Sequence, residues 1–383
     1  MEVLPLCFKL WTLSGVWRPM HYSSPVSKSL YTVYSLAVLI TLYSLTFFEF
    51  LDIVFNFGSL DDFANTAFLL LSMIIICCKA TNTLKKRAQI IEIHDLLRAE
   101  ICRGQNTTEN LMLEKFAKTC RSNTLNLFTM MMSCAMCLTL ESLLYHVNDR
   151  LLPMKIWLPY SLSSLTLFSL SFLYQVVTMT LANAITVAND TYITGLMIEI
   201  CAQLEILKLR LVELHDPKTL QMDENYSFNR EKDILKMCIQ HHNHIFKVKA
   251  NVEKAFNSIF LIQIVTSTLV FCVTALTFLK HEILSVELAS VILYFFTMMF
   301  QLFLFCWYGN KVILKSTEVR SAVFEMDWIP LPQAIKKDLI FLMMRTNIPI
   351  RFTSGYVVTL SLDSFMAILK LSYTTFNFLH QSS

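Results

Sequence analysis

Two charged side chains lie in an otherwise apolar stretch near the C-terminus, TLSLDSFMAILKLSYTTFNFLHQSS (359–383). Asp363 and Lys370 would each cost roughly 2.5 to 3.5 kcal/mol near the bilayer centre. They are roughly 10 Å apart along a helix axis, which is too far for an ion pair within one helix. We therefore expect water or a neighbouring subunit to reach them.

Helical spacing places these two charges in a polar stripe along one face of the predicted helix. Hydroxyl, amide and charged groups in one line suit a helix that faces a water-filled conduit, and their mixture provides no filter for a single ion. In the alternative interpretation, Lys370 extends to a lipid headgroup and Asp363 rests at the interface. The predicted pore-lining residues are Thr359, Asp363, Lys370, Thr374, Asn377 and Gln381.

The composition places the rest of the chain in a membrane. Of 383 residues, 55% are hydrophobic and 16% are charged, against about 25% charged in soluble domains. Apolar runs of about 20 residues alternate with charged stretches, as membrane-spanning helices require. We predict an all-α membrane protein with one domain over residues 1–383. The predicted spans are residues 30–51, 63–82, 124–145, 157–188, 258–279, 288–309 and 352–380.

The distribution of basic residues predicts the orientation. Most of the 32 Lys and Arg residues fall before the first span or in alternate loops, whereas the opposite loops hold only Arg150, Lys155 and Lys280. Short loops rich in Lys and Arg remain in the cytoplasm. We expect a cytoplasmic N-terminus and an extracellular C-terminus, the reverse of a G-protein-coupled receptor.

Amphipathic segments predict a helical anchor bundle on the cytoplasmic side. Residues 202–214 carry a leucine stripe, and residues 230–256 carry a second apolar stripe among charges. The uncharged run 156–189 would form roughly 50 Å of helix, longer than a hydrocarbon core of about 30 Å. We expect this helix to tilt or to project into the cytoplasm and join the bundle, where subunits would associate.

The segment before the last span reads as an amphipathic cytoplasmic helix within residues 327–355 that ends at Pro349. Pro349 and Gly355 predict a break between this helix and the spanning half of the seventh element. Such a break lets one half stay anchored while the other half moves.

Four segments of the chain resemble insect odorant receptors. They are SGYVVTLSLDSFMAILKLSYTTFNFLH (354–380), CWYGNKVILKSTEVRSAVFEMDWIPLP (306–332), CAQLEILKLRL (201–211) and MCIQHHNHIFKVKANVEKAF (237–256). The resemblance implies a tetrameric, ligand-gated, non-selective cation channel, formed with an obligate co-receptor in the plasma membrane of sensory dendrites. The second cytoplasmic loop is short, which favours the odorant-tuning subunit over the co-receptor.

The resemblance also implies an odorant pocket in the outer half of the bundle, between the second, third, fourth and sixth helices. A site for small volatile ligands should be aromatic and aliphatic, with few polar groups. The Tyr294 hydroxyl is expected to offer a hydrogen bond to an ester, ketone or alcohol. The candidate ligand-binding residues are Phe68, Tyr145, Phe168, Phe172 and Tyr294. Alternatively, these five aromatic residues only pack the bundle.

Other functional classes fit the sequence less well. Gustatory receptors, which share the fold, often end in Thr-Tyr and Gln-Phe pairs where this chain has Ser372-Tyr373 and Leu379-His380. A metabotropic seven-helix receptor is a further alternative. We find no catalytic motif, so we expect no enzyme activity and no cofactor. We expect the chain to contact membrane lipids and not nucleic acid.

A group of potential metal ligands is interpreted as the polar face of a helix. Cys238 and His242 have the spacing of a metal-binding pair on a helix, with His241 and His244 beside them. No third or fourth ligand is evident at a suitable position. We predict no metal site.

Overall fold

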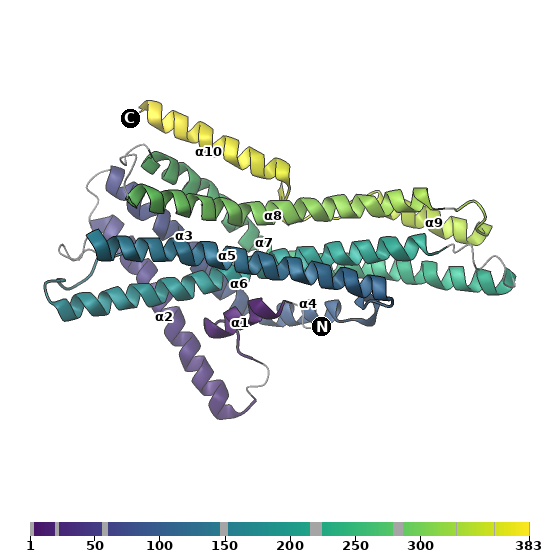
Figure 1. Ribbon diagram of the computed structural model, residues 1–383, viewed down its shortest axis with the longest axis horizontal. Coiled ribbons are helices and arrows are strands. Elements are labelled where there is room, and N and C mark those ends of the chain that lie inside the picture. The colour runs from purple at the N-terminus through teal and green to yellow at the C-terminus, as the bar shows by residue number, and fades with distance from the viewer. Residues whose placement is uncertain are drawn as a thin grey trace.

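Most of the long helices that build the molecule run along one common axis, and the first long helix lies at a steep angle to them (Figure 1). The structure is a computed structural model that describes residues 4–19, 23–55, 60–145, 152–214, 224–278, 286–326, 328–355 and 357–382. The long helices are α2 (Pro25–Phe55), α3 (Leu60–Lys85), α5 (Thr107–Tyr145), α6 (Leu165–Val212), α7 (Glu224–Phe278), α8 (Val286–Glu325) and α10 (Leu362–Ser382). The shorter elements are α1 (Pro5–Leu13), α4 (Arg87–Leu97), the 3-10 turn η1 (Glu100–Cys102), α9 (Gln333–Thr346), β1 (Thr353–Ser354) and β2 (Val358–Thr359).

Among the described residues, the helices α2, α3, α5, α6, α7 and α8 are long and apolar enough to span a membrane. The seventh helix, α10, is less apolar because Asp363, Lys370 and Asn377 interrupt its hydrophobic residues. The predicted helical architecture is therefore confirmed, apart from one short hairpin in which β1 and β2 pair antiparallel.

Two helices begin later than the predicted spans that contain them. The fourth helix begins at Leu165 instead of residue 157, because Pro159 removes a backbone donor and disfavours helix at the residue before it. The seventh predicted span, 352–380, begins with the hairpin, and its helix starts only at Leu362. The predicted extension of the fourth helix is confirmed, since α6 continues without a break to Val212.

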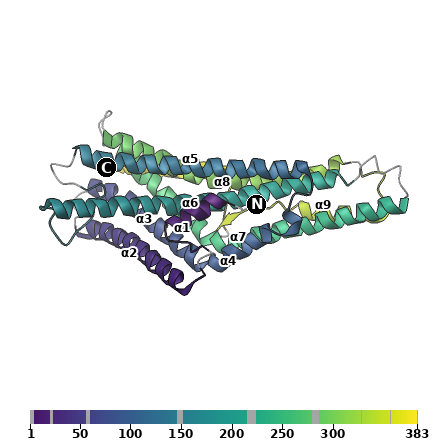
Figure 2. The ribbon, with the colours of Figure 1, turned by 60° about the horizontal axis from the view of Figure 1, so that its bottom comes forward.

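Helix α6 occupies the centre of the bundle. Every residue from Ile185 to Ile198 is buried, as expected for a helix that other elements surround on all sides. The turned view shows α1 lying across α6, with α5 and α8 beside it (Figure 2). The position of α6 makes it the element on which the others pack.

The short helices α1 and α4 are fixed to α6 by aromatic contacts. The rings of Trp11 and Tyr192 have centroids 4.7 Å apart. His94 of α4 stacks on the same tyrosine at 5.9 Å. Burial lowers the pKa of His94 to about 4, so this imidazole is neutral at pH 7 and packs as an aromatic ring.

A buried ion pair joins α3 to α6 within the bundle. Lys79 Nζ lies 2.7 Å from Asp190 Oδ1, and the two side chains are 0% and 1% exposed. Gln301 of α8 donates from Nε2 to the other carboxylate oxygen. One turn away, Thr83 Oγ1 donates to Asn189 Oδ1 at 2.8 Å. Lys79 falls near the end of the predicted span 63–82, and the structure places it inside the packed bundle.

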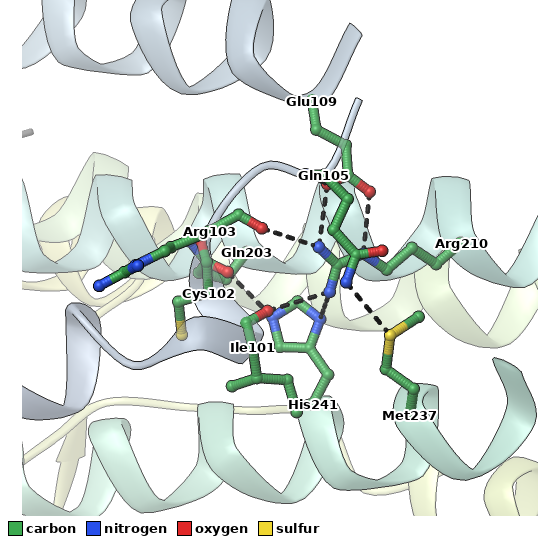
Figure 3. Close-up of polar contacts among 9 residues, drawn as sticks. All are labelled: Ile101, Cys102, Arg103, Gln105, Glu109, Gln203, Arg210, Met237 and His241. Carbon is green, nitrogen blue, oxygen red and sulfur yellow. Dashed lines mark hydrogen bonds and ion pairs between the residues drawn. The ribbon is translucent and has the colours of Figure 1, made fainter. Parts of the chain in front are cut away.

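A second polar network fastens the helices outside the predicted spans (Figure 3). We define the anchor bundle as residues 107–123, 189–212, 224–257 and 310–325 together with α4 and α9. Within it, Arg210 forms a two-pronged ion pair with Glu109, at 2.8 and 2.9 Å. Its remaining donors reach the carbonyls of Ile101 and Arg103, each at 3.0 Å, and His241 Nδ1 at 3.4 Å. All five guanidinium N–H groups therefore have acceptors.

The residues considered as metal ligands already have other partners. His241 accepts from Arg210 at Nδ1, so its Nε2 carries the proton and donates to Gln203 Oε1 at 2.9 Å. His244 Nε2 lies 2.8 Å from the Leu96 carbonyl oxygen. His242 packs edge-on against Phe246 at 5.0 Å. Within the described part of the chain, no His, Cys, Asp and Glu side chains gather as a metal site.

The buried ion pair generates a stability prediction. Lys79→Met leaves the Asp190 carboxylate without its cation, and we expect a loss of about 3 to 5 kcal/mol in the free energy of unfolding. The double variant Lys79→Met/Asp190→Asn keeps an acceptor for Gln301 and should regain most of this loss. Thermal unfolding of purified protein measures both.

The exposed pair of Lys118 with Glu114 (3.1 Å) provides the control. Lys118→Met should cost less than about 0.5 kcal/mol, because solvent screens such pairs. Equal effects of Lys79→Met and Lys118→Met would contradict the role given to the buried pair.

Candidate odorant pocket and conduit helix

Two of the five candidate pocket residues meet between α3 and α8. The rings of Phe68 and Tyr294 have centroids 5.0 Å apart with a 58° angle between their planes. Both residues are buried, at 7% and 9% exposure. The Tyr294 hydroxyl is hydrogen-bonded to the Ser72 hydroxyl and lies 3.4 Å from the Phe68 carbonyl oxygen. The expected partner of this hydroxyl is thus present within the chain itself.

The other candidates do not join this pair. Phe168 and Phe172 lie in the first turns of α6 and contact each other, with centroids 6.1 Å apart. Among the described ring contacts, they form a pair separate from Phe68 and Tyr294. Tyr145 is the last residue of α5, and its side chain lies outside the described residues.

Helix α10 buries one face and exposes the polar stripe. Phe365, Ile368 and Ser372 are buried; Phe365 packs edge-on against Phe303 of α8 at 5.6 Å. The Cys272 thiol of α7 donates to the Ser372 carbonyl oxygen at 3.8 Å. At 100° per residue, the buried face is centred opposite the polar stripe. The stripe therefore points away from this subunit's own bundle.

The described stripe residues follow this arrangement with one exception, Thr359. Asp363, Lys370 and Thr374 are exposed, and Asn377 is half-buried. Thr359 lies in β2 and so is not part of the helical stripe; the hairpin ends the helical periodicity that had placed it there. The side chain of Gln381 lies outside the described residues.

The hairpin before α10 is fixed to the neighbouring long helices. Thr353 donates from its backbone N–H and its hydroxyl to Glu253 Oε1 of α7, at 3.0 and 3.2 Å. Gly355 N–H donates to Asn257 Oδ1 at 2.7 Å, and Ile350 N–H donates to Ser316 Oγ of α8 at 3.0 Å. These contacts hold the hairpin in place between α9 and α10. We call the hairpin, residues 353–359, the pivot.

Two glycines allow the backbone conformation and the close packing of the pivot. Gly355 has a φ of +57°, a left-handed conformation that glycine adopts without strain. On α8, a Cβ at Gly309 would overlap the backbone of Leu360, so glycine allows the end of the hairpin to approach α8. The predicted break around Pro349 and Gly355 is confirmed, since α9 ends at Thr346 and α10 begins at Leu362.

Sequence reasoning missed two features of the bundle interior. The ion pair of Lys79 and Asp190 was not predicted, because the two residues lie at the ends of two predicted spans. Their opposite charges and their similar predicted depth in the membrane were the signal that could have identified the pair. Glu49 lies near the end of the predicted span 30–51, and the structure buries it completely. Its position in the apolar seam of α2 was the signal that could have identified it.

The comparisons with known proteins identify the family. Residues 59–373 match the family model described as 7tm Odorant receptor. The chain therefore belongs to the odorant receptor family, whose members are transmembrane receptors rather than enzymes.

Curated relatives and solved structures agree with this membership. The chain is 25% identical to Odorant receptor Or1 of Anopheles gambiae over 59% of each chain. It is 22% identical to Odorant receptor 2a of Drosophila melanogaster over 97% of this chain and 94% of that protein. The matches to the first three relatives span only 40 to 59% of their lengths.

The fold is that of a solved insect receptor. The structure of the olfactory receptor OR5 from Machilis hrabei in complex with eugenol superposes with a TM-score of 0.84 at 17% identity, over 98% of this chain and 97% of that one. The seven-helix architecture is thus the insect olfactory receptor fold.

The pivot generates a prediction at Gly309. Gly309→Ala raises helix propensity, but the added methyl group meets backbone atoms, so we expect a net loss of about 1 to 3 kcal/mol in the free energy of unfolding. Gly195→Ala is the control, because the atoms nearest to its methyl group belong to the flexible side chain of Leu4 rather than to backbone. Thermal unfolding separates the two; a Gly309→Ala variant at least as stable as the parent would contradict the close approach.

Proposed function

We propose that this chain is an odorant-tuning subunit that binds a small volatile ligand and gates a non-selective cation channel assembled with a co-receptor. The observation that carries the proposal is the orientation of α10, whose Asp363 and Lys370 are exposed on the face turned away from its own bundle. Family membership supports an odorant as the ligand.

The exposed face of α10 needs an aqueous or protein environment. Hydrocarbon provides no partner for a carboxylate or an ammonium group. Apolar side chains flank the polar stripe on both sides: Met366 and Tyr373 on one, Leu371 and Phe378 on the other. This pattern fits a helix that lines a central conduit with its stripe and contacts neighbouring subunits with its flanks, as a symmetric oligomer requires.

The aromatic pair of Phe68 and Tyr294 marks the proposed odorant pocket. Tyr294 lies on α8, the helix that also carries Gly309 at the pivot, roughly 22 Å away along the helix axis. A small displacement of α8 by a ligand would therefore reach the start of α10. In this proposal, ligand binding favours the open state of an existing closed and open equilibrium.

The proposal includes an orientation and a location. The N-terminus and the anchor bundle lie in the cytoplasm, where the anchor bundles of the subunits associate, and the C-terminus lies outside. The heterotetramer resides in the plasma membrane of sensory dendrites. The basic residues concentrated in alternate loops support this orientation.

Electrical recording tests the proposed function. We expect odorant-evoked, non-selective cation currents in cells that express this chain with an odorant co-receptor, and none from this chain alone. Surface labelling of the chain confirms its delivery in both cases. Responses that require G-protein signalling, with no current in any partner context, would support a metabotropic receptor instead.

The charges of the stripe should alter ion permeation. Asp363→Ala should lower cation permeability and Lys370→Ala should raise it, on the order of threefold for a monovalent ion about 6 Å from the charge in water. Reversal potentials and rectification measure the change. Lys118→Ala, at an exposed position of α5, should leave both unchanged. Unaltered permeation in both stripe variants would favour side chains that rest at the lipid interface.

A further inference from the structure

Glu49 interrupts an apolar seam at the point where α2 meets the rest of the bundle. The buried residues of α2 recur at helical spacing, and they are Val38, Leu42, Leu45 and Glu49. The first three are aliphatic, as expected for a packed seam. The fourth is an acid with 0% exposure.

Neither carboxyl oxygen of Glu49 has a hydrogen-bond partner in the described part of the chain. An ionised carboxylate without a partner is very costly in such surroundings, so the group carries a proton. It then presents one donor and one acceptor. Neither is used by another described residue, so both are available to a group that donates and accepts.

The groups around Glu49 do not supply that partner. Among the described residues, the titratable neighbours of Glu49 are the acid Asp52, the Cys77 thiol and the phenols of Tyr174 and Tyr294, and none of these is a cation. The Cys77 thiol lies 3.4 Å from the Thr46 hydroxyl. The Tyr174 hydroxyl is 2.6 Å from the Ser44 hydroxyl. These groups already have partners of their own.

The position of Glu49 connects it with the proposed odorant pocket. Thr46 of α2 lies 3.4 Å from Cys77 of the antiparallel helix α3, so Glu49, one turn further along α2, lies at the depth of the turn of α3 that begins at Ser72. The Ser72 hydroxyl is bonded to Tyr294, and the Tyr294 ring contacts Phe68. The Tyr294 hydroxyl is already occupied by Ser72. The aromatic pair thus provides an apolar wall, while Glu49 provides the unsatisfied polar group of the same interior region.

We propose that Glu49 determines the specificity of the odorant site by selecting ligands with a hydroxyl group, an inference that rests on the proposed function. A hydroxyl group both donates and accepts, so it satisfies both carboxyl oxygens. An ether, ester or ketone only accepts, and it leaves the carboxyl acceptor unpaired. A volatile alcohol or phenol is therefore the preferred class of ligand.

Isomeric probes test this selectivity on the purified full chain in lipid nanodiscs. 1-Octanol and 1-methoxyheptane contain the same atoms but differ in their donor, and homologous alcohols and methyl ethers extend the pair in both directions. We expect alcohols to raise the unfolding temperature at concentrations about tenfold lower than their isomeric ethers, the effect of one additional buried hydrogen bond.

Variants of Glu49 assign the selectivity to this residue. Glu49→Leu should abolish the difference between alcohol and ether, whereas Glu49→Gln, which also donates and accepts, should retain most of it. Glu141→Leu is the matched control, because this acid already accepts from the Ser290 hydroxyl at 2.8 Å. It should leave the alcohol to ether ratio unchanged.

Infrared difference spectroscopy provides a readout that does not depend on the Leu variant folding. We expect a carboxylic C=O band that shifts when 1-octanol is added and is absent from Glu49→Gln. Equal potency of alcohols and ethers, no stabilisation by any alcohol, or no such band in the parent protein would each overturn the inference. Alcohol selectivity without odorant-evoked current would instead contradict only the channel function, and currents evoked equally by ethers would contradict only the selectivity.

Discussion

A charge removed from water needs a partner, and this constraint governs where Lys79, Asp190, Asp363 and Lys370 lie. The bundle satisfies it in two ways. Lys79 and Asp190 neutralise each other inside the bundle, with Gln301 completing the acid's contacts. Asp363 and Lys370 are instead exposed on the outer face of α10, which in the proposed function faces water or neighbouring subunits. The first arrangement holds the chain together, and the proposed assembly would accommodate the second.

The mechanical organisation follows from the same division. Helix α6 forms the buried centre, and the Arg210 network fixes residues 101–103 to α6 and α7 outside the spans. Against this fixed body, α10 is attached through the hairpin and through a narrower apolar face. In the proposed function, a helix held in this way changes its angle while the packed centre stays fixed. Helix α8 contacts both the aromatic pair and the pivot, so it is the natural element to couple them.

Local patterns predicted the elements well because membrane insertion depends on local properties. Length and hydropathy predicted seven helices, and the continuous run before Asn189 predicted the extension of α6. The hairpin at 353–359 was not predictable from these patterns, because it depends on partners far away in the sequence, such as Glu253 and Asn257.

The candidate sites show the same limit. Helical periodicity showed that Asp363 and Lys370 share a face, and packing then determined that this face points outward. Periodicity did not bring Phe68 to Tyr294, nor did it show that Glu49 is enclosed, because both depend on how separate helices meet. Functional residues on one helix are therefore more predictable than sites assembled from several.

The central claim is that the polar face of α10 lines a water-filled conduit, and cysteine accessibility tests it most directly. Single cysteine substitutions along α10 would be exposed to charged thiol reagents while the channel assembled with the co-receptor is held open by odorant. The account predicts that modification changes the current at positions 363, 370 and 374 and not at the buried positions 365, 368 and 372, with the period of a helix. Modification without this period, or at none of these positions, would contradict it.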